Sequence, residues 1–211
     1  MKMLPILYAS STLSEHLVFE NGTRGKPIPI DFVLYYLETD EKKILIDAGC
    51  DTMPGFDMKN FIGPVAALNQ HGIQANEITD LIITHAHHDH IEGVKHFTGA
   101  TVYLQKEEYE KGKKYIPDGF EVSLFEDSLC ICDGVTVVKI GGHSRGSCVV
   151  EITDQNKKYV VCGDECYSPL CLEKGILTGS SVCPEKSRAF LTKYGSGEYL
   201  TLLCHQMPSD I

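Results

Sequence analysis

The chain of 211 residues lacks any apolar run of the ~18 residues that a membrane-spanning helix needs. A secretory signal peptide is not evident either. The first residues, MKMLPILYASS, contain one lysine and only a short apolar stretch, which Pro5 interrupts. These two features favour a cytoplasmic protein that does not enter a membrane.

Basic residues are scarce. The 19 lysines and arginines are outnumbered by 29 aspartates and glutamates, so the formal net charge is −10, and KGKK at 111–114 is the one basic cluster. Such a chain is a poor candidate for binding nucleic acid or an anionic membrane. A small-molecule substrate is the expected partner, because bound metal ions can reverse the local field of an acidic protein. The sequence does not indicate an oligomeric state.

No two cysteines have the C-x-x-C spacing, which argues against a zinc knuckle or a thioredoxin-like motif. The nine cysteines are scattered, and several lie in apolar runs such as VVCGD, SCVV and LLCHQ. In such runs cysteine acts as a small buried hydrophobic residue. We therefore expect reduced, structural thiols. A redox or metal-binding role stays open for the segment from Cys162 to Cys171.

Internal repeats, low-complexity tracts and linker-like changes of composition are also missing, so residues 1–211 are expected to form a single domain. The Gly- and Pro-rich segment 21–29 is expected to be a loop. Hydrophobic periodicity and turn residues predict a helical segment at 56–73, interrupted at Gly63-Pro64 and ending at Gly72, and helices at 106–114 and 184–194. They predict strands at 32–39, 43–49, 78–84, 100–105, 129–132, 135–140, 148–153, 158–164 and 198–204.

Strands dominate both halves of the chain, and helices are placed between them. Hairpins recur at DG (133–134) and DQNK (154–157), where a doubly wound parallel sheet would need crossover helices. Two sheets packed face to face and covered by helices accommodate this order better.

Four of the nine histidines fall within THAHHDH, residues 84–90. Further candidates follow other predicted strands at their carboxyl ends, namely His143, Asp164 and His205. If these strand ends meet at one edge of the sheets, the side chains converge. His85 and His87 point the same way on extended backbone and can chelate one ion, while Asp89 and His90 lie where a turn can aim them at a second. Imidazole and carboxylate suit Zn²⁺, Fe or Mn²⁺.

The chain resembles the metallo-β-lactamase superfamily from ILIDAG at 44–49 to His205. The resemblance rests on five motifs that occur in the order of that superfamily: Asp47, HAHHDH, GGHSRGS, GDE and CH. The resemblance implies an α/β fold, an αββα sandwich of two mixed β-sheets flanked by helices. It implies two divalent metal ions, Zn²⁺ in the first place with Fe or Mn²⁺ as alternatives. Asp47 would orient a ligand histidine. The implied ligands are His85, His87 and His143 for one metal, Asp89, His90 and His205 for the other, and Asp164 between them.

Two such ions can share a water and lower its pKa toward ~7, which favours hydroxide attack on a carbonyl. Esters, lactones, thioesters and lactams contain such a carbonyl. Asp89 is the natural proton carrier to the leaving group. Tyr167 follows Asp164 by three residues, and this Asp-x-x-Tyr pattern resembles the acyl-homoserine lactonases. The resemblance implies that the Tyr167 hydroxyl hydrogen-bonds the substrate carbonyl, and that the enzyme is a lactonase.

Departures from that branch leave other substrates open. The segment HSRGS replaces its usual Thr-Pro-Gly-rich loop, and IEGV follows the histidine motif in place of small residues. A glyoxalase II-like thioesterase or another small-ester hydrolase is the nearest alternative. A non-catalytic metal- or redox-binding protein is the alternative of another class. His88 is expected to point away from the metals, and His16, His71 and His96 to be surface or packing residues.

Overall fold

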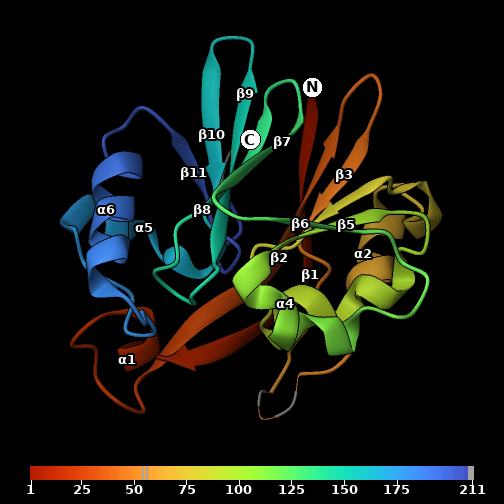
Figure 1. Ribbon diagram of the computed structural model, residues 1–211. Helices are drawn as coiled ribbons and strands as arrows, with labels where there is room; N and C mark the ends of the chain where they lie inside the picture. Colours follow the sequence, from red (N-terminus) through yellow and green to blue (C-terminus); the bar gives the residue numbers. More distant parts are fainter. Residues whose placement is uncertain (54, 56, 209–211) are drawn as a thin grey trace.

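The computed structural model describes residues 1–53, 55 and 57–208. Two β-sheets lie face to face at its centre, with helices on either outer side (Figure 1). The first sheet has the order β1 (Lys2–Ser14), β2 (Pro27–Glu38), β3 (Lys43–Ile46), β4 (Asp80–Ile82), β5 (Thr101–Gln105) and β6 (Val122–Phe125). The second has the order β11 (Leu200–Leu202), β10 (Lys157–Val161), β9 (Cys148–Asp154), β8 (Val135–Lys139) and β7 (Ser128–Cys132).

Both sheets are mixed. In the first sheet β1, β2 and β3 are antiparallel, whereas β3 to β6 run parallel. In the second sheet only the β10–β11 pair is parallel. The expected αββα sandwich of two mixed sheets is therefore confirmed, as are the hairpins β7–β8 and β9–β10.

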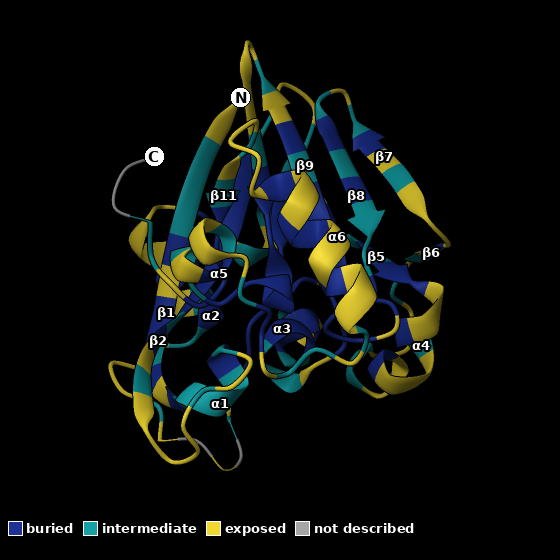
Figure 2. Ribbon diagram, turned by 90° about the vertical axis from the view of Figure 1, so that its left-hand side faces the viewer, coloured by how far each residue is buried: buried dark blue, intermediate teal, exposed yellow. Residues whose placement is uncertain are grey.

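Three apolar clusters hold the layers together. The middle one lies between the sheets and includes Tyr35 and Ile46 from the first sheet and Val137 and Val150 from the second. A second cluster packs the outer face of the first sheet on its helices, and a third packs the outer face of the second sheet on helices near the C-terminal end. Figure 2 shows the buried strands at the centre and the exposed outer helical faces. Burial of these faces is the main favourable term in folding.

The helices are short. They are α1 (Glu15–Val18), α2 (Pro64–Gln70), α3 (His88–Ile91), α4 (Lys106–Gly112), α5 (Pro169–Lys174) and α6 (Pro184–Tyr194). In Figure 1, α4 and α2 lie on one outer side of the sandwich and α5 and α6 on the other. Among the described residues, none of these helices is both long and apolar enough to cross a bilayer.

Several expected boundaries were wrong. The helix expected at 56–73 is only α2, because Pro64 occupies its first turn and Gly63 before it has a φ of 79°; residue 56 lies outside the described residues. The expected loop 21–29 ends early, since β2 already begins at Pro27. The long strand β1 was not expected at all. It lies at the edge of its sheet, with a partner strand on one side only. A proline is tolerated in such a strand, because the backbone N–H that it lacks is needed in an inner strand but not at the outer edge.

All nine cysteines lie within the described residues, and none is in a disulfide. Six are buried: Cys50, Cys148, Cys162, Cys166, Cys171 and Cys204. Cys130 is exposed, and two others are partly exposed. The side chains of Cys162, Cys166 and Cys171 belong to the cluster between the second sheet and its helices.

Candidate metal centre

The candidate residues follow strands of both sheets. Asp47 comes directly after β3, and the histidine motif begins two residues after the end of β4. His143 lies between β8 and β9, and Asp164 follows β10. His205 comes three residues after β11. Because these strand ends meet, side chains from distant parts of the sequence converge into three groups of potential metal ligands; two are described below, and the third, Asp47, His90 and Cys204, shares His90 with one of them.

The first group contains His85, His87, His143 and Asp164, whose ligand atoms all lie within 4.8 Å of one another. His87 Nδ1 is 2.9 Å from His85 Nε2 and 2.9 Å from His143 Nε2. Asp164 Oδ2 lies 3.3 Å from His143 Nε2. His87 is the exposed member of the group, and the other three are buried.

The second group contains Asp89, His90 and His205. The other oxygen of the Asp164 carboxylate, Oδ1, lies 3.0 Å from Nε2 of both His90 and His205. Asp89 Oδ2 lies 3.6 Å from His90 Nε2 and 3.7 Å from His205 Nε2. The carboxylate of Asp164 therefore faces both groups, one oxygen to each.

Hydrogen bonds on the outer side of the rings aim the inner nitrogens into the groups. Asp47 Oδ2 lies 2.7 Å from His90 Nδ1, and the same carboxylate accepts from the backbone N–H of Thr84 at 2.8 Å. His205 Nδ1 is 3.0 Å from the carbonyl oxygen of Asp31. These acceptors assign the proton to Nδ1 of each ring and leave a lone pair on Nε2.

This arrangement fits metal ions. His90 Nε2 and Asp164 Oδ1 are both buried and have no hydrogen-bond partner among the described residues, although they lie 3.0 Å apart. Two lone-pair atoms that face each other at this distance away from water are unfavourable unless a proton or a metal cation lies between them. The imidazole and carboxylate donors match the preferences of Zn²⁺, Fe and Mn²⁺.

The electrostatics of the groups differ. Burial lowers the pKa of His85 well below its usual value and the pKa of His143 to about 4. Both rings are therefore uncharged at neutral pH, which is the form that binds a metal ion. Burial also opposes a charge on His90, but Asp164, Asp47 and Asp89 outweigh it and raise the pKa. The carboxylates thus create a field around the second group that favours positive charge.

Tyr167 lies beside both groups. Its hydroxyl donates a hydrogen bond of 2.6 Å to Asp164 Oδ2. Burial, followed by the charge of Asp164, raises the pKa of Tyr167 well above its usual value, so the hydroxyl keeps its proton at neutral pH. Only 7% of the residue is exposed.

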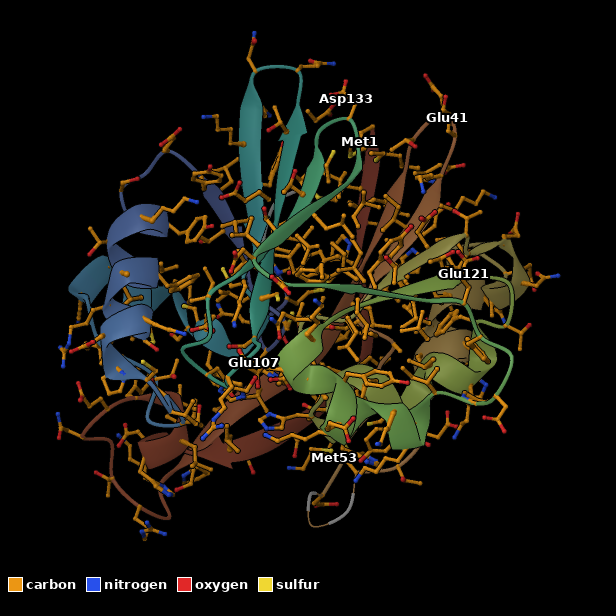
Figure 3. All side chains as sticks on the ribbon, viewed as in Figure 1. Met1, Glu41, Met53, Glu107, Glu121 and Asp133 are labelled. Atoms are coloured by element: carbon orange, nitrogen blue, oxygen red, sulfur yellow. The ribbon has the colours of Figure 1, made fainter. Side chains whose placement is uncertain are left out.

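A cavity of about 360 Å³ opens onto the ligands and Tyr167. The rest of its lining consists of His88, Ser180 and five apolar side chains: Leu13, Leu17, Ile30, Phe32 and Met53. No lysine or arginine is among the described residues that line it. Figure 3 shows Met53 at the lower end of the molecule, opposite Met1, Glu41 and Asp133.

His88 belongs to neither ligand group, as expected. Its Nε2 lies 2.6 Å from the carbonyl oxygen of Thr52, although the residue also borders the cavity. His96 Nε2 lies 2.9 Å from the carboxylate of Asp51, outside the site. The sequence did not indicate two buried glutamates near the ligands, Glu108 and Glu165. Glu108 lies in a helix that otherwise reads as solvent-exposed, and Glu165 follows Asp164 without a motif of its own.

The relatives of this chain include metal-dependent hydrolases. The lactonase AiiA of Bacillus thuringiensis subsp. kurstaki, an N-acyl homoserine lactonase, is 26% identical, and its match covers 79% of this chain and 77% of the lactonase. A hydroxyacylglutathione hydrolase of Yersinia pestis is 31% identical over 130 residues, which are 59% of this chain and 45% of that enzyme. This chain therefore matches less than half of the Yersinia enzyme.

Solved structures share the fold. An N-acyl homoserine lactone hydrolase with N-hexanoyl-L-homoserine bound at its catalytic metal centre superposes with a TM-score of 0.84 at 23% identity, over 97% of this chain and 92% of that one. The family described as "Metallo-beta-lactamase superfamily" matches residues 32–185, which include all the candidate ligands except His205. The chain therefore belongs to the metallo-β-lactamase superfamily.

Proposed function

We propose that this chain is a metal-dependent lactonase that opens lactones with a neutral, apolar acyl chain, with residues 1–211 as one catalytic domain. One observation carries the proposal. The Tyr167 hydroxyl donates to Asp164, whose carboxylate faces both ligand groups, and Tyr167 borders a cavity that is also lined by five apolar side chains. A polar lactone head and an aliphatic tail match these two kinds of lining.

The two groups would each hold one divalent ion, with Asp164 contributing an oxygen to both. Zn²⁺ is the proposed metal, and Fe or Mn²⁺ suits the same donors. When bound, such a pair of ions lowers the pKa of a shared water toward ~7 and polarises a carbonyl. The protein contributes the orientation of the ligands, the proton transfers and the exclusion of bulk water.

Tyr167 would bind the substrate. Its hydroxyl donates to Asp164 in the free protein, and it can turn this donation to the carbonyl oxygen of a lactone in the cavity. Negative charge develops on that oxygen in the transition state, so the hydrogen bond strengthens as the reaction proceeds. The raised pKa of Tyr167 keeps the hydroxyl available as a donor.

Asp89 would move the proton. It borders the cavity, and its carboxylate reaches the second ligand group with Oδ2. A carboxylate in this place can take the proton of the attacking water and deliver it to the ring oxygen that leaves. Asp164 is less suited to this role, because both of its oxygens face histidines.

Thioester hydrolysis is a second candidate, which the likeness to hydroxyacylglutathione hydrolase favours. The glutathione part of such a substrate carries carboxylates, which a site normally pairs with lysine or arginine. The described lining of the cavity contains neither residue, and this supports the lactone over the glutathione thioester.

Proton release from a matched panel of substrates tests the proposal. The panel contains a hexanoyl-homoserine lactone, a simple γ-lactone, S-lactoylglutathione and a nitrocefin-type lactam, and the protein is loaded in turn with Zn²⁺, Mn²⁺ and Fe²⁺. We expect turnover of the lactones that a chelator abolishes. Turnover of the thioester alone would replace the lactonase by a thioesterase with the same metal centre.

A further inference from the structure

Glu108 is a buried carboxylate in a helix whose neighbouring glutamates face solvent. Only 1% of the residue is exposed, whereas the side chain of Glu110 in the same helix α4 is 76% exposed. Glu108 Oε2 accepts a hydrogen bond of 3.0 Å from the backbone N–H of Ala86. Its Oε1 accepts from the Ser144 hydroxyl at 2.7 Å and from the backbone N–H of Gly146 at 2.9 Å.

These three donors belong to the two loops that supply the histidines of the first ligand group. Ala86 lies between His85 and His87, and Ser144 follows His143. One carboxylate therefore fastens together two segments that are far apart in the sequence. Both of its oxygens are used, one for each loop.

The packing around this carboxylate is close. A Cβ atom on Gly146 would lie 2.9 Å from Glu108 Cγ and 2.3 Å from Gln105 Oε1. A side chain at this position would push the loop away from α4, so glycine allows the approach. Later in α4, a Cβ on Gly112 would lie 2.9 Å from Ile91 Cδ1 and 3.4 Å from Ala86 Cβ.

The second ligand group has a different brace. Asp47 accepts from the backbone N–H and the hydroxyl of Thr84 and lies 2.7 Å from His90 Nδ1. Asp47 makes no hydrogen bond to the loop of His143, and Glu108 makes none to His90 or His205 among the described contacts. The Thr84 hydroxyl also lies 3.1 Å from His85 Nδ1, so Asp47 is linked to both groups, whereas the described hydrogen bonds of Glu108 go only to the loops of the first.

Glu165 adds a second hold on the loop of His143 alone. Its Oε1 accepts from the backbone N–H groups of Gly142 and His143 and from the Ser147 hydroxyl. Among the described hydrogen bonds, none joins Glu165 to Ala86. Glu108 is therefore the residue that ties the His143 loop to the His85–His87 loop.

A carboxylate is chemically required for this connection. Three uncharged donors converge on two oxygens, and burying a carboxylate is unfavourable unless each oxygen is satisfied. A glutamine of the same shape would offer one oxygen, and its amide NH₂ would face an N–H or O–H donor of one loop.

We propose that Glu108 is a positioning residue that sets the metal affinity of the first ligand group (His85, His87, His143 and Asp164) independently of the second. The proposal rests on the two-ion centre proposed above. Residues that orient metal ligands by hydrogen bonds typically change metal affinity by about 10- to 100-fold when they are replaced.

Chelator competition tests this role. The full chain is loaded with two equivalents of Co²⁺, whose absorption bands report the ligand geometry, and a chelator then withdraws the ions. In Glu108→Gln we expect one of the two withdrawal steps to occur at a chelator concentration at least about tenfold lower, with altered absorption bands. The other step stays unchanged. In Asp47→Asn the opposite step should weaken, which identifies each step with its group.

Glu110→Gln is the matched control, because it makes the same chemical change in the same helix at an exposed ion pair with Lys113. Both steps should stay at their wild-type positions. If Glu108→Gln does not fold, Ser144→Ala removes a single donor to the same carboxylate and should weaken the same step to a smaller degree.

Equal weakening of both steps in Glu108→Gln would overturn the proposal, because it would indicate a general loss of stability. Unchanged steps in Glu108→Gln, or in Ser144→Ala where that variant is used, would overturn it as well. A wild-type protein that binds a single Co²⁺ would instead refute the two-ion function, so the two failures are distinguishable.

Discussion

The rings of Tyr167 and His205 are stacked, with centroids 4.9 Å apart and an angle of 11° between their planes. His205 belongs to the second ligand group, and the hydroxyl of Tyr167 reaches Asp164 at the boundary between the groups. The stack holds the tyrosine ring, and the hydroxyl is the only part of the side chain that donates a hydrogen bond. Replacing Tyr167 by phenylalanine should therefore remove this hydrogen bond and keep the position of the ring.

Tyr167→Phe should lower kcat for lactones about tenfold, which corresponds to a lost hydrogen bond of ~1.5 kcal/mol to a developing charge. The stack on His205 is kept, so the metal content should not change. Steady-state kinetics together with metal analysis check both points. Tyr199→Phe, in which the lost hydroxyl lies outside the cavity, is the control. Unaltered lactone turnover in Tyr167→Phe would remove the best residue of the lactonase assignment.

Asp89→Asn should lower kcat by at least about 100-fold, since general acid–base catalysis typically contributes 10²- to 10⁴-fold. The amide can still offer an oxygen to the second ligand group, but it cannot accept and release a proton. Metal content is measured on the same samples, so that loss of turnover can be separated from loss of an ion. Wild-type turnover in a fully metal-loaded variant would exclude proton transfer by Asp89.

The apolar lining of the cavity predicts a preference for acyl-chain length. Leu17 contributes to this lining from α1, and Leu17→Trp would fill part of the space. Excluding ~two methylenes at ~0.8 kcal/mol each predicts a fall in kcat/KM of about tenfold for a decanoyl lactone. A butanoyl lactone should be nearly unaffected. Leu200→Trp, at an exposed position on β11, serves as the control; equal losses for both chain lengths would argue against this lining as the acyl site.

The cysteines should be unreactive in the folded protein except at the surface. Burial raises the pKa of Cys50 to about 11, so at pH 8 its thiol is protonated as well as inaccessible. Cys130 is exposed and should react with a thiol reagent first. Thiol titration should therefore show one fast cysteine before denaturation and all nine after it. Cys130→Ser should abolish the fast phase and leave turnover unchanged.

The sequence was most informative about the polar residues that follow predicted strands. HAHHDH, His143, Asp164 and His205 follow strands, and strand ends of a sandwich meet at one edge, so the convergence of these residues was predictable. Their roles as metal ligands remain a prediction. Glu108 could not be found in this way. It lies in KEEYE beside glutamates that face solvent, and its burial depends on loops at residues 86 and 144–146 that only the tertiary structure brings to it.

The errors in the fold have local causes. No strand was expected at the start of the chain, where β1 contains Pro5; an edge strand tolerates proline because its outer N–H groups need no partner. The apolar spacing at 56–73 extends over both sides of Gly63 and Pro64, yet among the described residues of this segment the helix begins only at Pro64. At 56–73 a backbone constraint therefore decided against the side-chain pattern, whereas in β1 the edge position removed the constraint that proline imposes.

Asp47 offers the sharpest test of how the second group is supported. Its backbone has a φ of 63°, a left-handed conformation that asparagine also adopts readily, so Asp47→Asn should not strain the turn. The asparagine NH₂ would, however, face a donor, either on Thr84 or at His90 Nδ1. We expect metal affinity of the second group to fall about 10- to 100-fold and the free energy of unfolding to fall by ~1–3 kcal/mol.

Chemical denaturation and chelator competition measure these two quantities. Asp133→Asn makes the same change in the exposed turn between β7 and β8, at the end of the molecule far from Met53, and should alter neither. If Asp47→Asn lost stability but kept wild-type metal affinity, Asp47 would support only the fold. The orientation of His90 would then have to come from its packing against His85, whose ring centroid lies 4.1 Å away.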